Sequence, residues 1–351
     1  MAGRIALEHG AGGRLMHELI GTIAGRLNSP SRGVDKAVLH TRTGRIAFTT
    51  DSFVMKPPVV NGCDIGMLSV NGTVNDLVTM GAKPEYLSLS LIIEESLESD
   101  FLMSIVESIG KAAKNAGVKI VTGDVKVVEK GGCDKIFINT SGVGRVYRGV
   151  NVSTTRAKPG DAVILTGSIG DHGAAVLAAR GEFQLEADVQ SDCAPLTSIV
   201  EALVRRKAPL HTLIDPTRGG LATSLNEVAE SSRVSVEIRE EDIPVRDEVQ
   251  GFCEVLGIEP LYLGCEGRLV IFVPQAYAEK AVRVLRRLKV SKDACVIGRV
   301  VGRSRMGEVW LRTRAGGLRS LPMLHGIPLP RICLPPLSTP SKEEPVLQRA
   351  V

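Results

Sequence analysis

The sequence predicts an α/β or α+β protein built of two domains and an extended C-terminal tail. Its 351 residues are enough for two domains of ordinary size, each with its own hydrophobic core. Short β runs alternate with helical periods through residues 1–150, which is typical of mixed folds. A polar, turn-forming segment at residues 154–160 interrupts this pattern, which then restarts. We therefore predict an N-terminal domain over residues 1–153, a C-terminal domain over residues 154–315 and a proline-rich tail over residues 316–351.

The first domain opens with a helical period and then a strand. Apolar residues recur at helical spacing through residues 15–27, and residues 46–50 are typical of a strand that ends at Asp51. Apolar residues within 64–80 share a helical face, and Gly81 just beyond them fits a helix C-cap. The elements that follow are predicted to be strands at 86–93, 118–122 and 135–146 and a helix at 100–115.

The second domain continues with alternating strands and helices. A glycine-containing turn at residues 167–170 and a loop at residues 215–220 each lead into a predicted helix. The predicted elements are strands at 162–165, 268–273 and 295–301 and helices at 171–180, 221–230 and 275–288.

Composition excludes several classes of function. Lys and Arg total 43 against 39 Asp and Glu, and aromatic residues are only 3%, whereas a nucleic-acid-binding protein needs a denser basic face with stacking rings. No stretch approaches the roughly 20 consecutive apolar residues that cross a bilayer. Residues 1–13 carry neither an apolar signal core nor an Arg-rich presequence, so we expect a cytoplasmic protein. Seven cysteines without a CxxC pair predict neither a disulfide framework nor a zinc site.

A cysteine near the end of the chain lies in a segment built to be extended. Cys333 follows Pro330-Arg331-Ile332, and prolines at 328, 335, 336 and 340 surround this run. Proline fixes φ and removes backbone donors, so the tail should adopt a polyproline-like course across solvent. A thiol on such an arm indicates a carrier of a chemical group. The alternative is a surface cysteine without function.

Three aspartates stand at positions where a metal and a nucleotide can be bound. Asp51 and Asp124 stand at or near the ends of predicted strands, and Asp76 lies in the helix predicted at 64–80. Carboxylate oxygens suit Mg²⁺, which commonly bridges a few carboxylates to substrate phosphates. The alternative is that they cap turns and solvate a helix face. Asn71 and Asn75, one turn apart in an apolar helix, need polar partners, and we include Asn75 among the nucleotide-binding candidates.

Two glycine-rich segments precede helices. They lie at residues 10–13 and 218–220, and such turns aim backbone N–H groups and a helix N-terminus at phosphate. Gly12, Gly13 and Arg218 are therefore phosphate-binding candidates, with the Arg218 guanidinium as a forked donor. Neither segment matches the GxxxxGK[ST] or the GxGxxG pattern. The glycines can equally serve tight turns.

Lys126 and Glu266 are candidates for proton transfer. Lys126 lies two residues beyond Asp124, so both side chains should point to the same side of a strand. Glu266 stands close to two glycines before an apolar strand, where a carboxylate can face a cleft. A solvated lysine and a turn glutamate are the alternatives. His172 opens a predicted helix, and we expect a structural or binding role for it.

Several of these motifs occur in an order that resembles the aminoimidazole ribonucleotide synthetase superfamily. The motifs are Gly-Ala-Gly-Gly-Arg, Thr-Asp-Ser-Phe, Val-Asn-Asp-Leu-Val-Thr-Met-Gly-Ala-Lys-Pro, Val-Thr-Gly-Asp-Val-Lys, Ile-Gly-Asp-His-Gly and Asp-Pro-Thr-Arg-Gly-Gly-Leu, and the resemblance covers roughly residues 5–333. Within the superfamily the chain is similar to the carbamoyl dehydratases of nickel-iron hydrogenase maturation, which the Pro-Arg-Ile-Cys tail singles out.

The resemblance implies a homodimer whose N-terminal sheets pair, with ATP and Mg²⁺ near the interface. It implies that Cys333 receives a carbamoyl group from a carbamoyltransferase maturation protein and that ATP drives its dehydration to a thiocyanate. The cyano group then passes to iron held by a further hydrogenase maturation complex. Transferred to matching positions, Asp51, Asp76 and Asp124 are the metal and nucleotide ligands. Lys126 and Glu266 are the proton-transfer candidates, and the sequence does not choose between them.

One departure from the family pattern concerns the tail. The family cysteine usually ends the chain, whereas residues 334–351 follow Cys333 here. Either the extension is trimmed, or the pocket tolerates a passing chain, or Cys333 is no longer a carrier. In the last case the protein is a non-catalytic ATP-binding scaffold for maturation partners. Selenophosphate synthetase, a rival of the same fold, would carry a reactive Cys or selenocysteine in the segment at residues 10–14, which has none.

Overall fold

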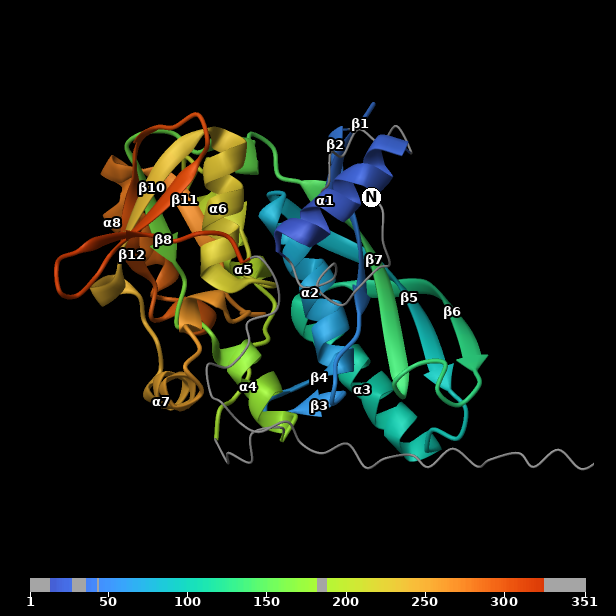
Figure 1. Ribbon diagram of the computed structural model, residues 1–351. Coiled ribbons are helices and arrows are strands. Elements are labelled where there is room, and N and C mark those ends of the chain that lie inside the picture. The colour runs from blue at the N-terminus through green and yellow to red at the C-terminus, as the bar shows by residue number, and fades with distance from the viewer. Residues whose placement is uncertain (1–12, 27–35, 43, 182–187, 325–351) are drawn as a thin grey trace, which may run out of the picture.

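The computed structural model describes residues 13–26, 36–42, 44–181 and 188–324, which form two α/β domains side by side (Figure 1). The sequence prediction of a mixed α/β fold is confirmed. Within the described ranges, no helix is both long and apolar enough to span a bilayer.

The N-terminal domain is a five-stranded sheet with helices on one side. The strand order is β1-β2-β7-β5-β6, and the β5–β6 pair is parallel whereas the other pairs are antiparallel. The elements are α1 (Arg14–Arg26), β1 (Lys36–Thr41), β2 (Gly44–Phe53), β3 (Val59–Val60), β4 (Cys63–Asp64), α2 (Ile65–Thr79), β5 (Ala82–Glu94), α3 (Ser99–Ala116), β6 (Lys119–Val128) and β7 (Ile136–Val146).

The C-terminal domain is a seven-stranded sheet with the strand order β14-β13-β10-β12-β8-β11-β9. Its strands are β8 (Asp161–Leu165), β9 (Thr212–Ile214), β10 (Val234–Arg239), β11 (Val270–Pro274), β12 (Cys295–Arg303), β13 (Glu308–Arg312) and β14 (Leu318–Ser320). Its α-helices are α4 (Asp171–Ala179), α5 (Thr197–Arg205), α6 (Gly220–Ser232), α7 (Asp247–Leu256) and α8 (Gln275–Leu285). Short 3₁₀ turns lie at Thr154–Arg156, Glu240–Asp242, Pro260–Tyr262 and Lys289–Ser291.

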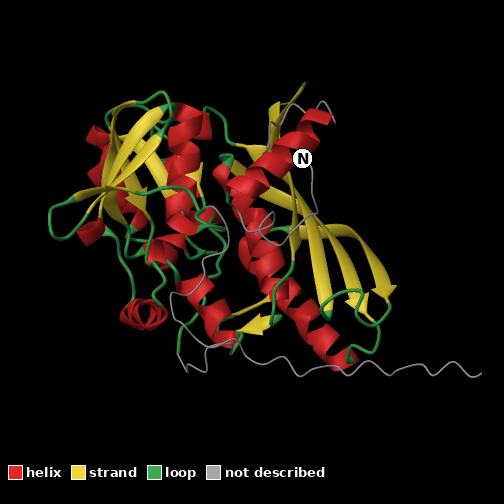
Figure 2. Ribbon diagram, in the orientation of Figure 1, coloured by secondary structure: helices red, strands yellow, loops and turns green. Residues whose placement is uncertain are grey.

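Helices cover both faces of the C-terminal sheet, because its central strands are apolar on both sides (Figure 2). In β8, Val163 and Leu165 belong to the cluster that includes α6, whereas Ala162 and Ile164 belong to the cluster that includes α5 and α8. Successive side chains of a strand point to opposite faces, so the continuous apolar run requires two covering layers. All of these residues are fully buried.

Helix α2 lies between the N-terminal sheet and the C-terminal domain. It begins where Asp64 accepts a hydrogen bond from the Met67 backbone N–H at 2.9 Å, as an N-cap does. It ends before Gly81, whose φ of 67° is left-handed and whose absent Cβ would lie 2.5 Å from Val150 Cγ1. The sequence prediction of this helix and of the glycine beyond it is confirmed.

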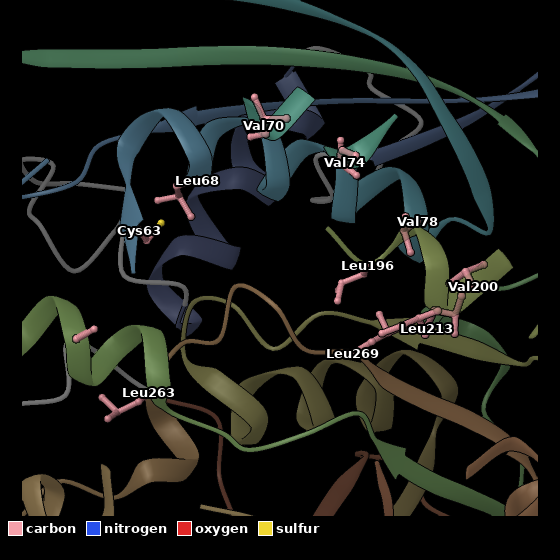
Figure 3. Close-up of a cluster of buried hydrophobic side chains, with 14 of the residues drawn as sticks. Cys63, Leu68, Val70, Val74, Val78, Leu196, Val200, Leu213, Leu263 and Leu269 are labelled. Atoms are coloured by element: carbon pink, nitrogen blue, oxygen red, sulfur yellow. The ribbon is translucent and has the colours of Figure 1, made fainter. Parts of the chain in front are cut away.

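One hydrophobic cluster runs through α2 into the C-terminal domain. Val74 and Val78 of α2 face the side of the molecule that carries Leu196 and Val200 (Figure 3). The apolar residues of this helix are buried almost all round, since the sheet covers one side and the second domain covers the other. The boundary between the domains is therefore a packed seam.

Other predicted elements differ from the observed ones mainly at their ends. The strand predicted at 118–122 extends to Val128, so that Asp124 and Lys126 lie within β6. The sequence did not predict β1, whose last four residues are exposed, or α5, α7 and β10. Strand β14 pairs with β13 through residues 318–320, within the range predicted as tail.

Candidate active site

Two aspartates from different domains share one lysine. The Lys36 ammonium Nζ lies 2.7 Å from Asp76 Oδ1 and 3.2 Å from Asp215 Oδ1, and it donates to Thr79 Oγ1 at 3.1 Å. Asp76 and Asp215 are only 6% and 8% exposed. Buried carboxylates require a counter-charge, and Lys36 supplies one here. The second oxygen of Asp76 accepts a hydrogen bond from Thr49 Oγ1 at 3.0 Å.

Asp51 lies on β2 beside the same helix. Gly72 of α2 has no side chain, and a Cβ there would lie 3.9 Å from Asp51 Oδ2 and 2.8 Å from Phe53. Asp51 Oδ1 accepts a hydrogen bond from the Ser52 backbone N–H at 2.8 Å, and its carbonyl accepts one from Asn139. The missing side chain at Gly72 therefore lets α2 approach β2 where Asp51 lies.

Glu266 is half-buried at the seam between the domains. Burial raises the pKa of its carboxyl well above the usual range, and the nearby Cys193, Asp215 and Asp51 raise it further because each would add negative charge. A carboxyl group with a raised pKa holds its proton more tightly than an ordinary glutamate and is a stronger base once ionised. The electrostatic coupling places Glu266 in the same region as Asp51 and the Asp76–Asp215 pair.

The backbone of Glu266 is fixed by a neighbouring aspartate. Asp192 accepts hydrogen bonds from the backbone N–H groups of Glu266 at 3.0 Å and Gly267 at 3.2 Å. The Arg268 Nε lies 3.6 Å from the Asp192 carboxylate and supplies positive charge in this buried place. A Cβ on Gly267 would lie 1.8 Å from the Asp192 carbonyl oxygen, so only glycine permits this approach.

Asn75 and Asn71 extend from α2 into the seam. The Asn75 side chain donates to the carbonyls of Ala194 and Glu266 at 3.1 Å each and accepts from the Leu196 N–H at 2.9 Å. Asn71 Nδ2 donates to Cys193 Sγ at 3.5 Å, and its Oδ1 has no hydrogen-bond partner among the described residues. Both asparagines thus point at the C-terminal domain, and Asn75 joins it to α2.

Asp124 and Lys126 lie on the other face of the N-terminal sheet. The register aligns Asp51 with Thr140, Leu89 and Gly123, so Asp124 points away from the face that carries Asp51. Three strand spacings separate β2 from β6, which is about 14 Å. Within one chain, the three aspartates predicted from the sequence are therefore not one set of metal ligands.

Lys126 contacts Asp124 directly, and both side chains are exposed. The Lys126 ammonium lies 2.7 Å from Asp124 Oδ2, which confirms that the two side chains share one side of the strand. This hydrogen bond, together with the Val125 backbone N–H, lowers the pKa of the Asp124 carboxyl. No hydrogen bond between described residues connects this pair to Glu266 or to the Asp76–Asp215 pair.

The predicted phosphate-binding residues are only partly described. Gly13 is buried at the start of α1, and its carbonyl accepts a hydrogen bond from the His17 N–H at 3.2 Å. Arg218 is exposed just before α6 and lies close enough to His17 to lower its pKa, although the hydrogen bond to Glu227 dominates and raises it. Gly12 and Cys333 lie outside the described residues.

His172 is buried in the C-terminal domain, as a structural role requires. Its Nδ1 shares a hydrogen bond of 2.9 Å with Ser191 Oγ, and burial lowers its pKa to about 4. Ser191 Oγ also accepts the Cys193 backbone N–H at 3.2 Å. A neutral His172 thus supports the loop that carries Asp192 and Cys193.

The sequence prediction missed two residues of this site. Asp215 directly follows β9, at the kind of strand end that singled out Asp51, but within its loop the prediction assigned a binding role only to Arg218. Lys36 gave no local signal, because β1 was not predicted and the two carboxylates come from distant parts of the chain.

Two carboxylates, Asp76 and Asp215, are available to a divalent cation, and the described residues contain no group of three or more His, Cys, Asp or Glu side chains placed to hold one. Asp76 and Asp215 each place one carboxylate oxygen within 3.2 Å of the Lys36 ammonium, which supplies positive charge at this position. Hard oxygen donors of this kind suit Mg²⁺. Asp51 lies near enough to raise the pKa of Glu266 together with Asp215, so it belongs to the same charged region.

Comparisons with known proteins identify the family of both domains. The chain matches the AIR synthase related protein N-terminal domain over residues 33–146 and the corresponding C-terminal domain over residues 158–310. It is 44% identical over 335 residues to the carbamoyl dehydratase HypE of Rhodobacter capsulatus, which covers 94% of this chain and 98% of that one.

Solved structures give the same result. A HypE–HypF complex matches with a TM-score of 0.83 at 44% identity and covers 89% of this chain and 100% of that one. HypE in complex with ATP matches with a TM-score of 0.77 at 44% identity and covers 92% of this chain and 98% of that one.

Proposed function

The chain belongs to the carbamoyl dehydratase HypE family of AIR synthase related proteins, and we propose that it uses ATP to dehydrate an S-carbamoyl group on its own Cys333. The product is a thiocyanate on the same sulfur, which supplies the cyanide ligand of a nickel-iron hydrogenase. The general function, that of a carbamoyl dehydratase in hydrogenase maturation, follows from membership of the family.

The observation that carries the proposal is the charged region in the seam. It combines a carboxyl group of raised pKa, Glu266, with a pair of buried carboxylates that hold a cation, Asp76 and Asp215. A dehydration driven by ATP needs both, because a phosphoryl group must be transferred and protons must be removed. A relative solved in complex with ATP supports nucleotide binding by this chain.

The proposed dehydration has two steps, phosphoryl transfer to the carbamoyl oxygen and removal of the nitrogen protons. An amide oxygen is a poor leaving group, so the carbamoyl oxygen attacks the γ-phosphorus of ATP, ADP departs, and an O-phosphorylated isothiocarbamate forms, in which carbon carries sulfur, nitrogen and the phosphorylated oxygen. Removal of the nitrogen protons then expels phosphate and leaves the nitrile carbon on sulfur. Mg²⁺, when bound, would offset the charge of the transferring phosphoryl group. Asp76 and Asp215, with Asp51 close by, are the residues that would hold it.

Glu266 is the base that this chain can offer near the nucleotide. Burial raises the pKa of its carboxyl, which makes the carboxylate a stronger base toward a nitrogen proton. Lys126 is paired with Asp124 on the opposite face of the sheet, so within one chain it does not serve the same site. A second copy of the chain could bring its own Lys126 and Asp124, if the N-terminal sheets pair as a homodimer.

Exposed apolar residues support such a homodimer. On the sheet face away from α2, Phe48, Tyr86 and Ile92 are 40%, 46% and 40% exposed. Exposed apolar side chains of this size favour burial against another surface. For the other partners we propose a carbamoyltransferase as donor, supported by the HypE–HypF complex of a relative, and an iron-carrying maturation complex as acceptor in the cytoplasm.

A mass measurement tests the function. Purified chain carbamoylated at Cys333 is incubated with Mg²⁺ and ATP, and the peptide that contains Cys333 should lose the mass of one water molecule. Glu266→Gln should bind ATP but lose water at least about a hundredfold more slowly, since general-base catalysis contributes about 10²–10⁴-fold. Cys333→Ala is the control without a carrier.

The extension after Cys333 motivates the second candidate function. Residues 334–351 continue the chain past the carrier, and if they prevent its entry the protein is an ATP-binding scaffold. Full-length chain and chain ending at Cys333 are compared in the same assay. ATP binding without loss of water in both forms would refute the enzymatic function, whereas loss in the shorter form alone would show that trimming is required.

A further inference from the structure

The position between Asp76 and Asp215 already holds a positive charge from the chain itself. We propose that Lys36 occupies this cation position while nucleotide is absent and must withdraw before Mg²⁺ binds, so that Mg²⁺ binding depends on nucleotide. The inference rests on the proposed Mg²⁺–ATP site and adds to it an internal competitor for the metal.

The first argument is the geometry of the ammonium group. Among the described residues, three oxygens lie within hydrogen-bond distance of Lys36 Nζ: Asp76 Oδ1 at 2.7 Å, Thr79 Oγ1 at 3.1 Å and Asp215 Oδ1 at 3.2 Å. An ammonium carries three donors and no acceptor, so it suits a position surrounded by oxygens. The lysine side chain is 24% exposed, whereas both carboxylates are almost completely buried. The charge therefore sits where a metal ion would sit.

The second argument is that the two cations exclude each other. Mg²⁺ binds oxygen at about 2.0–2.1 Å and needs the same carboxylate lone pairs that face the ammonium. A divalent and a monovalent cation within about 4 Å also repel each other strongly in a poorly solvated site. In the absence of nucleotide, Mg²⁺ must therefore displace the Lys36 ammonium, which then loses its ion pairs with Asp76 and Asp215.

The third argument concerns how Lys36 can move. Lys36 is the first residue of β1, an edge strand, and it aligns with Thr49 of β2. The backbone pairing holds the strand, so a rotation of the four-carbon side chain is enough to withdraw the ammonium. The polyphosphate of a nucleotide bound beside Asp76 and Asp215 would offer new oxygens to the displaced charge. Bound nucleotide would thereby offset the free energy lost when Lys36 leaves the two carboxylates, and Mg²⁺ would bind more tightly.

A structural role is the competing explanation. Asp76 belongs to α2 and Asp215 to the C-terminal domain, so Lys36 also connects the two domains. If this connection were its whole role, removing the charge would weaken folding and leave the preference for Mg²⁺ with nucleotide unchanged. The two explanations therefore differ in the metal titration.

The experiment is a calorimetric titration of full-length protein with Mg²⁺, without and with a non-hydrolysable ATP analogue. Lys36→Gln keeps hydrogen-bonding groups but removes the charge, and it should bind Mg²⁺ alone at least about tenfold more tightly than the wild type. The factor by which the analogue strengthens Mg²⁺ binding should fall in the variant, since this factor measures the coupling between the two ligands. Lys36→Arg keeps the charge and should bind Mg²⁺ alone as weakly as the wild type.

Lys56→Met is the matched control. The Lys56 ammonium lies 3.0 Å from Asp134, but its side chain is 75% exposed, so its loss should leave both titrations unchanged. Unchanged or weaker Mg²⁺ binding by Lys36→Gln would overturn the inference. Failure of every variant and of the wild type to bind Mg²⁺ with the analogue would instead refute the proposed nucleotide site.

A measurement on the wild type covers the case in which Lys36→Gln does not fold. The ¹⁵N ammonium resonance of Lys36, assigned by its loss in Lys36→Arg, should be observable because the buried carboxylates slow its exchange with water. Addition of Mg²⁺ with the ATP analogue should shift it by displacing the group from Asp76 and Asp215. An unshifted resonance in the loaded protein would contradict the inference.

Discussion

The two sheets of the molecule differ in how completely the chain covers them. Every residue of β8 in the C-terminal sheet is buried, whereas in β6 of the N-terminal sheet every residue except the last is exposed. Val125 and Val127 of β6 are 55% and 67% exposed. The C-terminal sheet carries helices on both faces and the N-terminal sheet has α2 on one (Figure 2).

The difference shows which sheet is covered on both faces by the described part of the chain. The C-terminal domain finishes its core within the chain, because α6 and the α5–α8 pair meet the two faces of its sheet. Among the described residues, the N-terminal domain leaves apolar side chains exposed on the face away from α2, and β6 pairs with another strand on one side only. An exposed strand edge is a template for pairing with another chain. The proposed homodimer is the arrangement that would complete it.

Matched truncations test this difference most strongly. Ile164→Ala in β8 removes a fully buried side chain and should lower the free energy of unfolding by about 4 kcal/mol, whereas Val127→Ala in β6 should change it by about 0.5 kcal/mol or less. Both values come from urea denaturation at a protein concentration low enough to keep the chain monomeric. Equal decreases in the free energy of unfolding would show that β6 is covered as completely as β8.

A buried histidine makes the C-terminal domain sensitive to acid. The pKa of His172 is lowered from 6.5 to about 4, so the unfolded chain binds its proton first as the pH falls. The resulting stability is present above pH 6.5 and is lost as the pH falls from 6.5 to 4, by about 3 kcal/mol. His172→Gln should lack this component, measured as the difference between the two unfolding free energies at pH 7 and pH 4. The same pH dependence in both proteins would assign the effect to other groups.

Asn75 connects the N-terminal domain to the C-terminal domain. Asn75→Leu removes three hydrogen bonds across the seam and should lower the free energy of unfolding by about 2 kcal/mol. Hydrogen exchange should then show earlier opening of α2 relative to the C-terminal sheet. Thr22→Val, which removes one exposed hydrogen bond within α1, is a control of similar chemistry that should leave the seam unchanged.

The smallest effect on folding should come from the open face. Tyr86→Glu places a charge on a residue that is 46% exposed and should change the stability of the monomer by less than about 0.5 kcal/mol. If the N-terminal sheets pair, it should weaken self-association at least about tenfold in sedimentation velocity, since a buried charge without a partner is costly. Glu279→Lys on α8 is a surface control in the C-terminal domain. Unaltered association would place any dimer interface elsewhere.

Local patterns predicted the elements but not the contacts between them. The helix ending before Gly81 and the shared side of Asp124 and Lys126 follow from spacing alone, and both were predicted correctly. The grouping of Asp124 with Asp51 as ligands of one metal needs the strand order, which the sequence does not contain.

The candidate site depends on residues that are far apart in sequence. Lys36, Asp76 and Asp215 meet because α2 packs against the C-terminal domain, and the Asp76–Asp215 pair spans most of a domain length. Neither hydrophobic periodicity nor a short motif predicts such a contact between residues that are distant in the sequence. Glu266 could be singled out because glycines stand beside it and allow its backbone to approach Asp192.

The close contact at Gly267 limits which amino acids evolution can place at this position. Its hydrogen atom stands where any other amino acid would place a carbon 1.8 Å from the Asp192 carbonyl oxygen. In a library of all substitutions at Gly267, the variants should therefore fail to fold. Their loss of activity would then report on packing and not on the role of Glu266. Close backbone packing therefore restricts position 267 to glycine, whatever the role of Glu266 beside it.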